Sequence, residues 1–265
     1  MIVTVILYLA LGVAAGLLAG LLGVGGGLIL VGALAWLLPS QGVPVEHAMH
    51  AALATSLASI LVTGLSSARA HHRRGSVLWP SVRWLVPGLL VGAWLGSRFA
   101  GHLSGSILRS GVAFYCFLVA TQLAMDWPRA RGERLDSPRG PGLSLAGVGI
   151  GAVSALVGIG GGSMTVPLLV WRGVAPVRAV GTSSACGVAI ALASAAGYAS
   201  QWQVQGMPAG SSGYVYWPAA LGIAATSLLA APYGARLAHR LPPTALKRVF
   251  AGFLALVGLS LWISG

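Results

Sequence analysis

Two glycine-rich stretches have the clearest capacity in this sequence to bind a ligand. Residues 23–27 read GVGGG and residues 158–162 read GIGGG, and each stretch interrupts an apolar run. Every glycine costs roughly 0.5 to 1 kcal/mol relative to alanine inside a helix, so both stretches predict a break in a helix. The helix that begins after a break presents backbone N–H groups and the positive end of its dipole. Two such ends directed at one point would bind an anion without a cationic side chain.

Hydroxyl side chains near the breaks could supply further hydrogen-bond donors. Ser163 follows the second break, and two pairs of hydroxyls open the apolar segments that follow the two hairpins. The candidate anion-binding residues are therefore Gly25, Gly26, Gly27, Thr55, Ser56, Gly160, Gly161, Gly162, Ser163, Thr182 and Ser183. Serine and threonine in membrane helices also bond their own helix carbonyls, so a structural role stays open for each hydroxyl.

Glu46, His47 and His50 are titratable residues at the start of an apolar segment. A histidine near a carboxylate could relay a proton, so these three residues are candidates for proton coupling. The alternative is an ordinary position at the membrane surface, because a segment end reaches water at little cost. The sequence contains no nucleophile–base pair, metal-ligand cluster or cofactor motif. We therefore expect neither an enzyme nor a metal or cofactor site.

The composition indicates whether these residues lie in water or in a lipid bilayer. Of the 265 residues, 56% are hydrophobic and 8% are charged, whereas soluble domains carry about 25% charged residues. The apolar stretches are continuous rather than alternating, which favours transmembrane helices over a β-barrel. The net charge of +12 comes from basic residues in the gaps between apolar runs, which indicates membrane topology rather than nucleic-acid binding. The sequence therefore predicts an all-α integral membrane protein in a lipid bilayer.

Ten apolar segments can be marked, five on each side of one polar linker. They are residues 2–22, 28–38, 46–68, 82–100, 107–125, 142–157, 163–172, 176–200, 215–237 and 245–263. The linker, residues 127–141, is rich in proline and charge. We expect a first membrane repeat over residues 1–126 and a second over residues 142–265. Cys116 and Cys186 fall inside apolar runs and are expected to be buried thiols.

The two halves resemble each other in sequence. Both contain a GGG break, a later Thr-Ser pair, a Trp-Pro pair at residues 79 and 217, and a Gly-x-Arg pattern at residues 96 and 234. If the segments flanking each break form a hairpin that returns to its own side, the second half is inverted relative to the first. All basic residues except Arg98 and Arg109 then lie in the cytoplasm, whereas parallel halves would divide them evenly. We therefore expect inverted repeats, with both termini outside and the linker in the cytoplasm.

The short segments after the breaks fix the expected depth of the site. A segment of ten or eleven residues, at about 1.5 Å per residue, reaches about halfway through a core of about 30 Å. The breaks should therefore face each other near mid-depth. Gly12, Gly16 and Gly20 are spaced as a helix-packing surface, and a homodimer is left open.

The two broken segments and the Thr-Ser pairs that follow resemble the signature of the TauE/SafE family of sulfite exporters. The stretches that carry the resemblance are GLLGVGGGLILV and GIGGGSMTVPLL, and the likeness extends over essentially the whole chain. One departure is Gly32, which stands where the second copy has Pro167. The resemblance implies a multi-pass permease of the bacterial inner membrane that exports a small sulfur-containing anion such as sulfite or sulfoacetate.

Two other functions remain open at this point. The same site could serve uptake or channel-type conduction of a related anion such as thiosulfate. A non-transporting membrane assembly partner is the alternative from another class. The mechanism that we expect is alternating access around a mid-membrane anion site.

Overall fold

The computed structural model describes residues 2–22, 26–125, 137–237 and 243–263. Ten α-helices lie in these ranges: α1 (Ile2–Leu22), α2 (Gly27–Leu37), α3 (Val45–His72), α4 (Trp79–Ala100), α5 (Gly105–Ala124), α6 (Pro141–Val157), α7 (Gly162–Trp171), α8 (Pro176–Ala199), α9 (Trp217–Leu237) and α10 (Pro243–Ile263). A 3-10 turn (η1, Pro39–Gln41) follows α2, and two short antiparallel strands, β1 (Ser211–Ser212) and β2 (Val215–Tyr216), precede α9. Each of the ten predicted segments corresponds to one helix.

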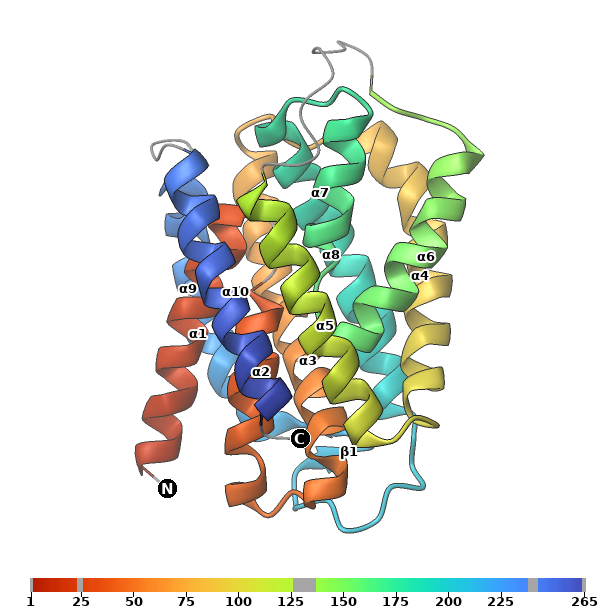
Figure 1. The fold of residues 1–265 in the computed structure, drawn as a ribbon. Coiled ribbons are helices and arrows are strands. Elements are labelled where there is room, and N and C mark those ends of the chain that lie inside the picture. The colour runs from red at the N-terminus through yellow and green to blue at the C-terminus, as the bar shows by residue number, and fades with distance from the viewer. Residues whose placement is uncertain (1, 23–25, 126–136, 238–242, 264–265) are drawn as a thin grey trace.

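The helices form one bundle whose two ends can be followed in Figure 1. The helix pair α1 and α2 begins and ends at the lower end, whereas α6 and α7 begin and end at the upper end. Between these pairs the chain rises in α3, descends in α4 and rises in α5, and the second half runs through α8, α9 and α10 in the opposite sense. The lower end therefore gathers the start of α3, the end of α4 and the loop that carries β1 and β2.

Five of the described helices are long and apolar enough to cross a membrane. They are α1, α3, α5, α8 and α9, and the most apolar of them is α1. Helices α2 and α7 have 11 and 10 residues, as the half-depth prediction requires. The predicted membrane-protein class is therefore confirmed, and the short strands are a small addition to its helical architecture.

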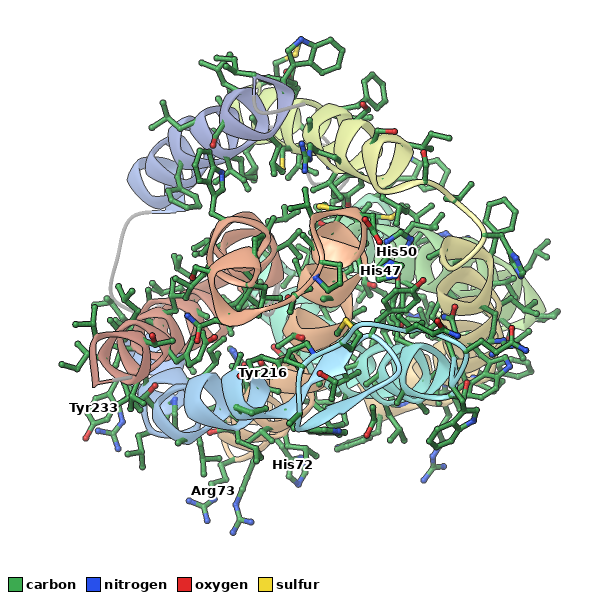
Figure 2. The ribbon with its side chains drawn as sticks, turned by 90° about the horizontal axis from the view of Figure 1, so that it is seen from below. His47, His50, His72, Arg73, Tyr216 and Tyr233 are labelled. Atoms are coloured by element: carbon green, nitrogen blue, oxygen red, sulfur yellow. The ribbon has the colours of Figure 1, made fainter. Side chains whose placement is uncertain are left out.

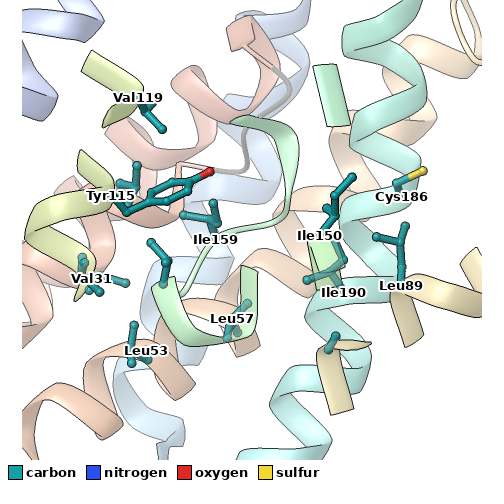
Figure 3. Close-up of a cluster of buried hydrophobic side chains, with 14 of the residues drawn as sticks. Val31, Leu53, Leu57, Leu89, Tyr115, Val119, Ile150, Ile159, Cys186 and Ile190 are labelled. Carbon is teal, nitrogen blue, oxygen red and sulfur yellow. The ribbon is translucent and has the colours of Figure 1, made fainter. Parts of the chain in front are cut away.

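The main helix contacts join one half of the sequence to the other. Helix α1 packs on α9 and α4 packs on α6, while α3 contacts α8 and α5 contacts α10. Each of these pairs combines a helix before the linker with one after it. The core lies where α3, α4 and α8 meet, around the fully buried side chains of Leu57, Leu89 and Ile190 (Figure 3).

Glycine faces bring the paired helices into close contact. A Cβ atom on Gly16 of α1 would lie 2.8 Å from the Ser227 Cα of α9, and Gly12 and Gly20 face the same helix. On α4, a Cβ atom on Gly96 would lie 2.6 Å from the Ala152 carbonyl oxygen of α6. The packing interpretation of the α1 glycines is confirmed.

Two threonines hold the starts of α4 and α9 from helices of the other half. The Leu78 N–H, just before α4, donates to the Thr182 hydroxyl of α8 at 3.0 Å, and the Tyr216 N–H, just before α9, donates to the Thr55 hydroxyl of α3 at 3.1 Å. In each case a Trp-Pro pair begins the helix, where proline needs no hydrogen-bond partner. The threonine hydroxyls thus accept from the N–H groups that precede the two helices, while the prolines have no N–H that needs an acceptor.

The first prediction concerns the glycine faces. Gly16→Ala should lower the melting temperature of the purified protein, because the added methyl group overlaps the α9 backbone and overpacking costs about 1 to 3 kcal/mol. Gly111→Ala is the matched control, since a Cβ atom there meets nothing within 4 Å. Thermal unfolding in detergent measures both variants. Equal melting temperatures would contradict the proposed role of the α1–α9 contact.

The second prediction concerns the two threonines. Thr55→Val and Thr182→Val keep the side-chain shape but leave a buried backbone N–H without its acceptor, so each should cost about 1 to 3 kcal/mol of stability. Thermal unfolding should show similar losses for the two variants. Thr121→Val is the control, because the Thr121 hydroxyl only bonds Phe117 of its own helix. A loss at one threonine alone would show that the two contacts are not equivalent.

Candidate anion-binding site

The two helix breaks meet inside the bundle. A Cβ atom on Gly27, the first residue of α2, would lie 3.0 Å from the Ile159 Cα of the second break and would overlap the Gly158 carbonyl oxygen. Gly158 has a φ of +75°, and a Cβ atom there would overlap the Leu53 side chain of α3. Glycine at position 27 therefore permits a backbone-to-backbone contact between the breaks, and glycine at position 158 adopts its positive φ without strain.

The start of each short helix is left open by the same local geometry. Gly26 and Gly161 precede α2 and α7 with φ values of 66° and 71°, the left-handed conformation that glycine adopts without strain. No described side chain caps either helix start. The first N–H groups of a helix have no carbonyl partner within that helix, so the starts of α2 and α7 are candidates to bind an acceptor. Gly25 lies outside the described residues.

Ser56 connects the two breaks directly. Its hydroxyl lies 3.1 Å from the Gly158 carbonyl oxygen and 3.3 Å from the Gly27 carbonyl oxygen, and the side chain is fully buried. Because a hydroxyl has one proton, it can donate fully to only one of these carbonyls at a time. Ser56 is therefore the candidate residue that the structure brings closest to both breaks.

Apolar side chains surround this contact. Ile159 is fully buried within the second break, and Val31, Leu53 and Leu57 pack nearby (Figure 3). Such surroundings exclude water and raise the cost of an unpaired polar group. Hydrogen-bond donors at the breaks would therefore bind an anion more strongly than they would in water.

The second break carries more hydroxyl groups than the first. Ser163, in the first turn of α7, lies 2.6 Å from the Tyr115 hydroxyl of α5, and Figure 3 shows the tyrosine directed toward this break. The buried hydroxyls of Ser154 and Thr165 have no hydrogen-bond partner among the described residues. The residue of α2 that corresponds to Ser163 is Leu28, so the second break is more polar than the first.

Sequence reasoning did not include Tyr115 among the site residues. A tyrosine within a membrane segment needs a partner for its hydroxyl, and this signal was available. Which hydroxyl would be that partner depends on the contact between α5 and α7, which neither helix specifies alone.

The structure places the other predicted hydroxyls outside the contact between the breaks. The hydroxyls of Thr55 and Thr182 accept hydrogen bonds at the starts of α9 and α4, and Ser183 is fully buried in α8.

Helix α8 lies close to the second break. A Cβ atom on Gly187 of α8 would lie 2.8 Å from the Gly160 carbonyl oxygen. A cavity of about 10 Å³ beside these glycines is lined by Ala19, Ile60, Gly64, Ser67, Gly160, Ser184 and Gly187. That volume holds about one water molecule. The breaks are thus packed together in this conformation.

Glu46, His47 and His50 lie away from the breaks, at the lower end of the bundle where α3 begins (Figure 2). The Nε2 atom of buried His50 lies 3.2 Å from the Ala100 carbonyl oxygen and 3.0 Å from that of Leu103. Carbonyl oxygens only accept, so Nε2 carries the proton and donates to the carbonyls at the C-terminal end of α4. The described residues include no group of three or more His, Cys, Asp or Glu that could hold a metal ion.

Comparison with known proteins identifies the family. The family model "Sulfite exporter TauE/SafE" matches residues 8–261. A Haemophilus influenzae protein named "Probable membrane transporter protein" is 37% identical, with 98% of each chain covered. A Methanocaldococcus jannaschii protein of the same description is 27% identical over 96% of this chain and 93% of its own. No solved structure was found to match the chain.

These matches agree with the described membrane helices and cover both glycine breaks. The chain belongs to the TauE/SafE sulfite exporter family of membrane transporters.

Proposed function

We propose that this transporter exports a small sulfur-containing anion, such as sulfite or sulfoacetate, through a site at the two helix breaks. The observation that carries the proposal is the contact at Ser56 between Gly27, the first residue of α2, and Gly158 of the second break, in an apolar environment, with the uncapped start of α7 four residues after Gly158. Backbone N–H groups at a helix start favour an anion. The family match adds the class of substrate that its name describes.

The proposed architecture is a pair of inverted repeats, residues 1–126 and 142–265, joined by a cytoplasmic linker at residues 127–141. The packing partners support this division, because exchanging the two halves turns the α1–α9 contact into the α6–α4 contact and leaves α3–α8 and α5–α10 unchanged. The opposite directions of the two short hairpins are also in keeping with it (Figure 1). In the bacterial inner membrane, both termini would then lie outside.

The proposed mechanism is alternating access. The anion would accept hydrogen bonds from the starts of α2 and α7 and from the hydroxyls of Ser56 and Ser163, and a movement of one half against the other would expose it to each side in turn. Neutral donors suit release, and a buried arginine would itself cost about 2.5 to 3.5 kcal/mol at mid-depth. In this proposal, the described conformation, with a cavity of about 10 Å³ beside Gly160, would be a closed state.

The remaining candidates have supporting roles in this proposal. Thr55, Thr182 and Ser183 lie on the two helices, α3 and α8, that pack against the breaks, so they would position those helices. Glu46, His47 and His50 would couple proton movement to transport at the lower end of the bundle. Their distance from the breaks means that this coupling would act through the movement of α3 rather than through contact with the anion.

The third prediction tests the proposed site by flux of radiolabelled sulfite and sulfoacetate into proteoliposomes. Wild-type flux should saturate, and Ser56→Ala and Ser163→Ala should each lower it at least about tenfold, because a hydrogen bond to a charged group contributes about 1.5 to 3 kcal/mol. Thr121→Val is the control on α5. Gly161→Leu should abolish flux, but the serine variants avoid the strain of a side chain at φ +71°.

Each outcome has a distinct meaning. Flux that rises linearly with concentration would indicate a channel. Flux in the opposite direction only would indicate an importer. If both serine variants keep wild-type flux and stability, the anion site lies elsewhere. If no sulfur anion is transported, the protein is better described as a non-transporting membrane assembly partner.

A further inference from the structure

A cavity opens at the lower end of the bundle, and none of the residues that line it belongs to a helix break. It has a volume of about 610 Å³, within the range of ordinary ligand sites. The start of α3, the end of α4 and the loop after α8 form its walls. Its basic lining side chains are His47, Arg98 and His102, and its amide side chains are Gln201, Gln203 and Gln205.

The cavity contains the guanidinium of Arg98 but no acid to balance its charge. Glu46 is the only acid among the described residues, and it does not line the cavity. The single hydrogen bond described for Arg98 is a long one, 3.5 Å, to the neutral hydroxyl of Ser200. An unneutralised guanidinium in a concave site attracts and orients anions, with two N–H groups that fit two oxygens of one sulfonate or sulfite.

The position of Arg98 also separates it from the other basic residues. In the proposed topology Arg98 and Arg109 are the only Lys or Arg residues outside, because positive charge is disfavoured on that side. The preference of Lys and Arg for the cytoplasmic side therefore does not explain Arg98, which lines an outside cavity together with two histidines.

The cavity wall is held in place by specific contacts. The Gln201 amide donates to the Ser97 carbonyl oxygen at 3.0 Å, and a Cβ atom on Gly101 would overlap the Gln201 side chain. Gly101 thus lets Gln201 join the ends of α4 and α8. The amide donors of Gln201 are used in this contact, so Gln203 and Gln205 are the amides left to face a ligand.

An aromatic floor separates the cavity from the interior. Tyr214 lines the cavity and is buried, its ring stacks on His50 at 4.7 Å, and its edge meets Tyr198 at 6.3 Å. The Tyr198 hydroxyl donates to the Ala155 carbonyl oxygen, three residues before the second break. Burial raises the pKa of the Tyr214 phenol above its usual value, so the floor carries no negative charge that would repel an anion.

We propose that this cavity is a second anion-binding site, which holds a small sulfonate or sulfite through Arg98, His47 and His102 at the outer mouth of the transport path. It rests on the proposed function for its place in that path, but the binding itself does not depend on transport. The site is open to water, so salt should weaken it, and it should bind less tightly than the apolar site at the breaks.

The test is equilibrium binding of sulfoacetate to the purified full-length protein in detergent. Trp202 lines the cavity with 80% of its surface exposed, so its fluorescence should respond to the ligand, and Trp202→Phe should remove the signal. Arg98→Gln should weaken binding about five- to tenfold, as expected for one charged contact at a partly exposed site. Arg83→Gln is the matched control, since Arg83 is also exposed and lies near the opposite end of α4.

Flux in proteoliposomes separates this inference from the proposed function. Arg98→Gln should raise KM about five- to tenfold with little change in the maximal rate, whereas Ser56→Ala should leave the Trp202 signal intact. Binding that Arg98→Gln weakens, in a protein without flux, would support the cavity site and contradict the transport proposal. Wild-type flux with no Trp202 response, or equal binding by Arg98→Gln and Arg83→Gln, would overturn the cavity site.

Discussion

Backbone polar groups inside a membrane must find partners within the protein, and the rest of this structure depends on that constraint. Two helices stop at glycine-rich breaks, where the regular hydrogen bonds of a helix are lost. The breaks are tolerated because they lie against each other and against α3 and α8, with the Ser56 hydroxyl between a carbonyl oxygen of each break. In the proposed site, donors at the two helix starts would bind the ligand, so the need to satisfy the backbone and the capacity to bind an anion would have one origin.

The close contact of the breaks requires close contact of the helices around them. Glycine faces on α1 and α4 let these helices approach α9 and α6 at backbone distance. In lipid there is little hydrophobic driving force between helices, so dispersion contacts over such faces carry much of the association.

The sequence was informative wherever a local pattern decides the structure. The apolar segments, the two breaks, the half-length of α2 and α7 and the α1 packing face all follow from composition and spacing, and the structure agrees with them. The hydroxyl groups were harder to interpret. Thr55 and Ser56 are neighbours in one segment, yet Thr55 holds the start of α9 while Ser56 bridges the breaks. Their different roles depend on which helix faces each side chain, and the lower cavity depends likewise on a loop folded over the ends of α3, α4 and α8.

The pairing of α1 with α9 has a consequence for biosynthesis. The Thr226 hydroxyl donates to the Leu9 carbonyl oxygen across 217 residues of sequence. At translation rates of about 5 to 20 residues per second, α1 waits roughly 10 to 40 seconds for its partner to be made. During that interval its glycine face is open to lipid or to other membrane proteins. Helix α1 therefore packs on α9 only after 217 further residues have been made, and most of the other helices are synthesised before this contact can form.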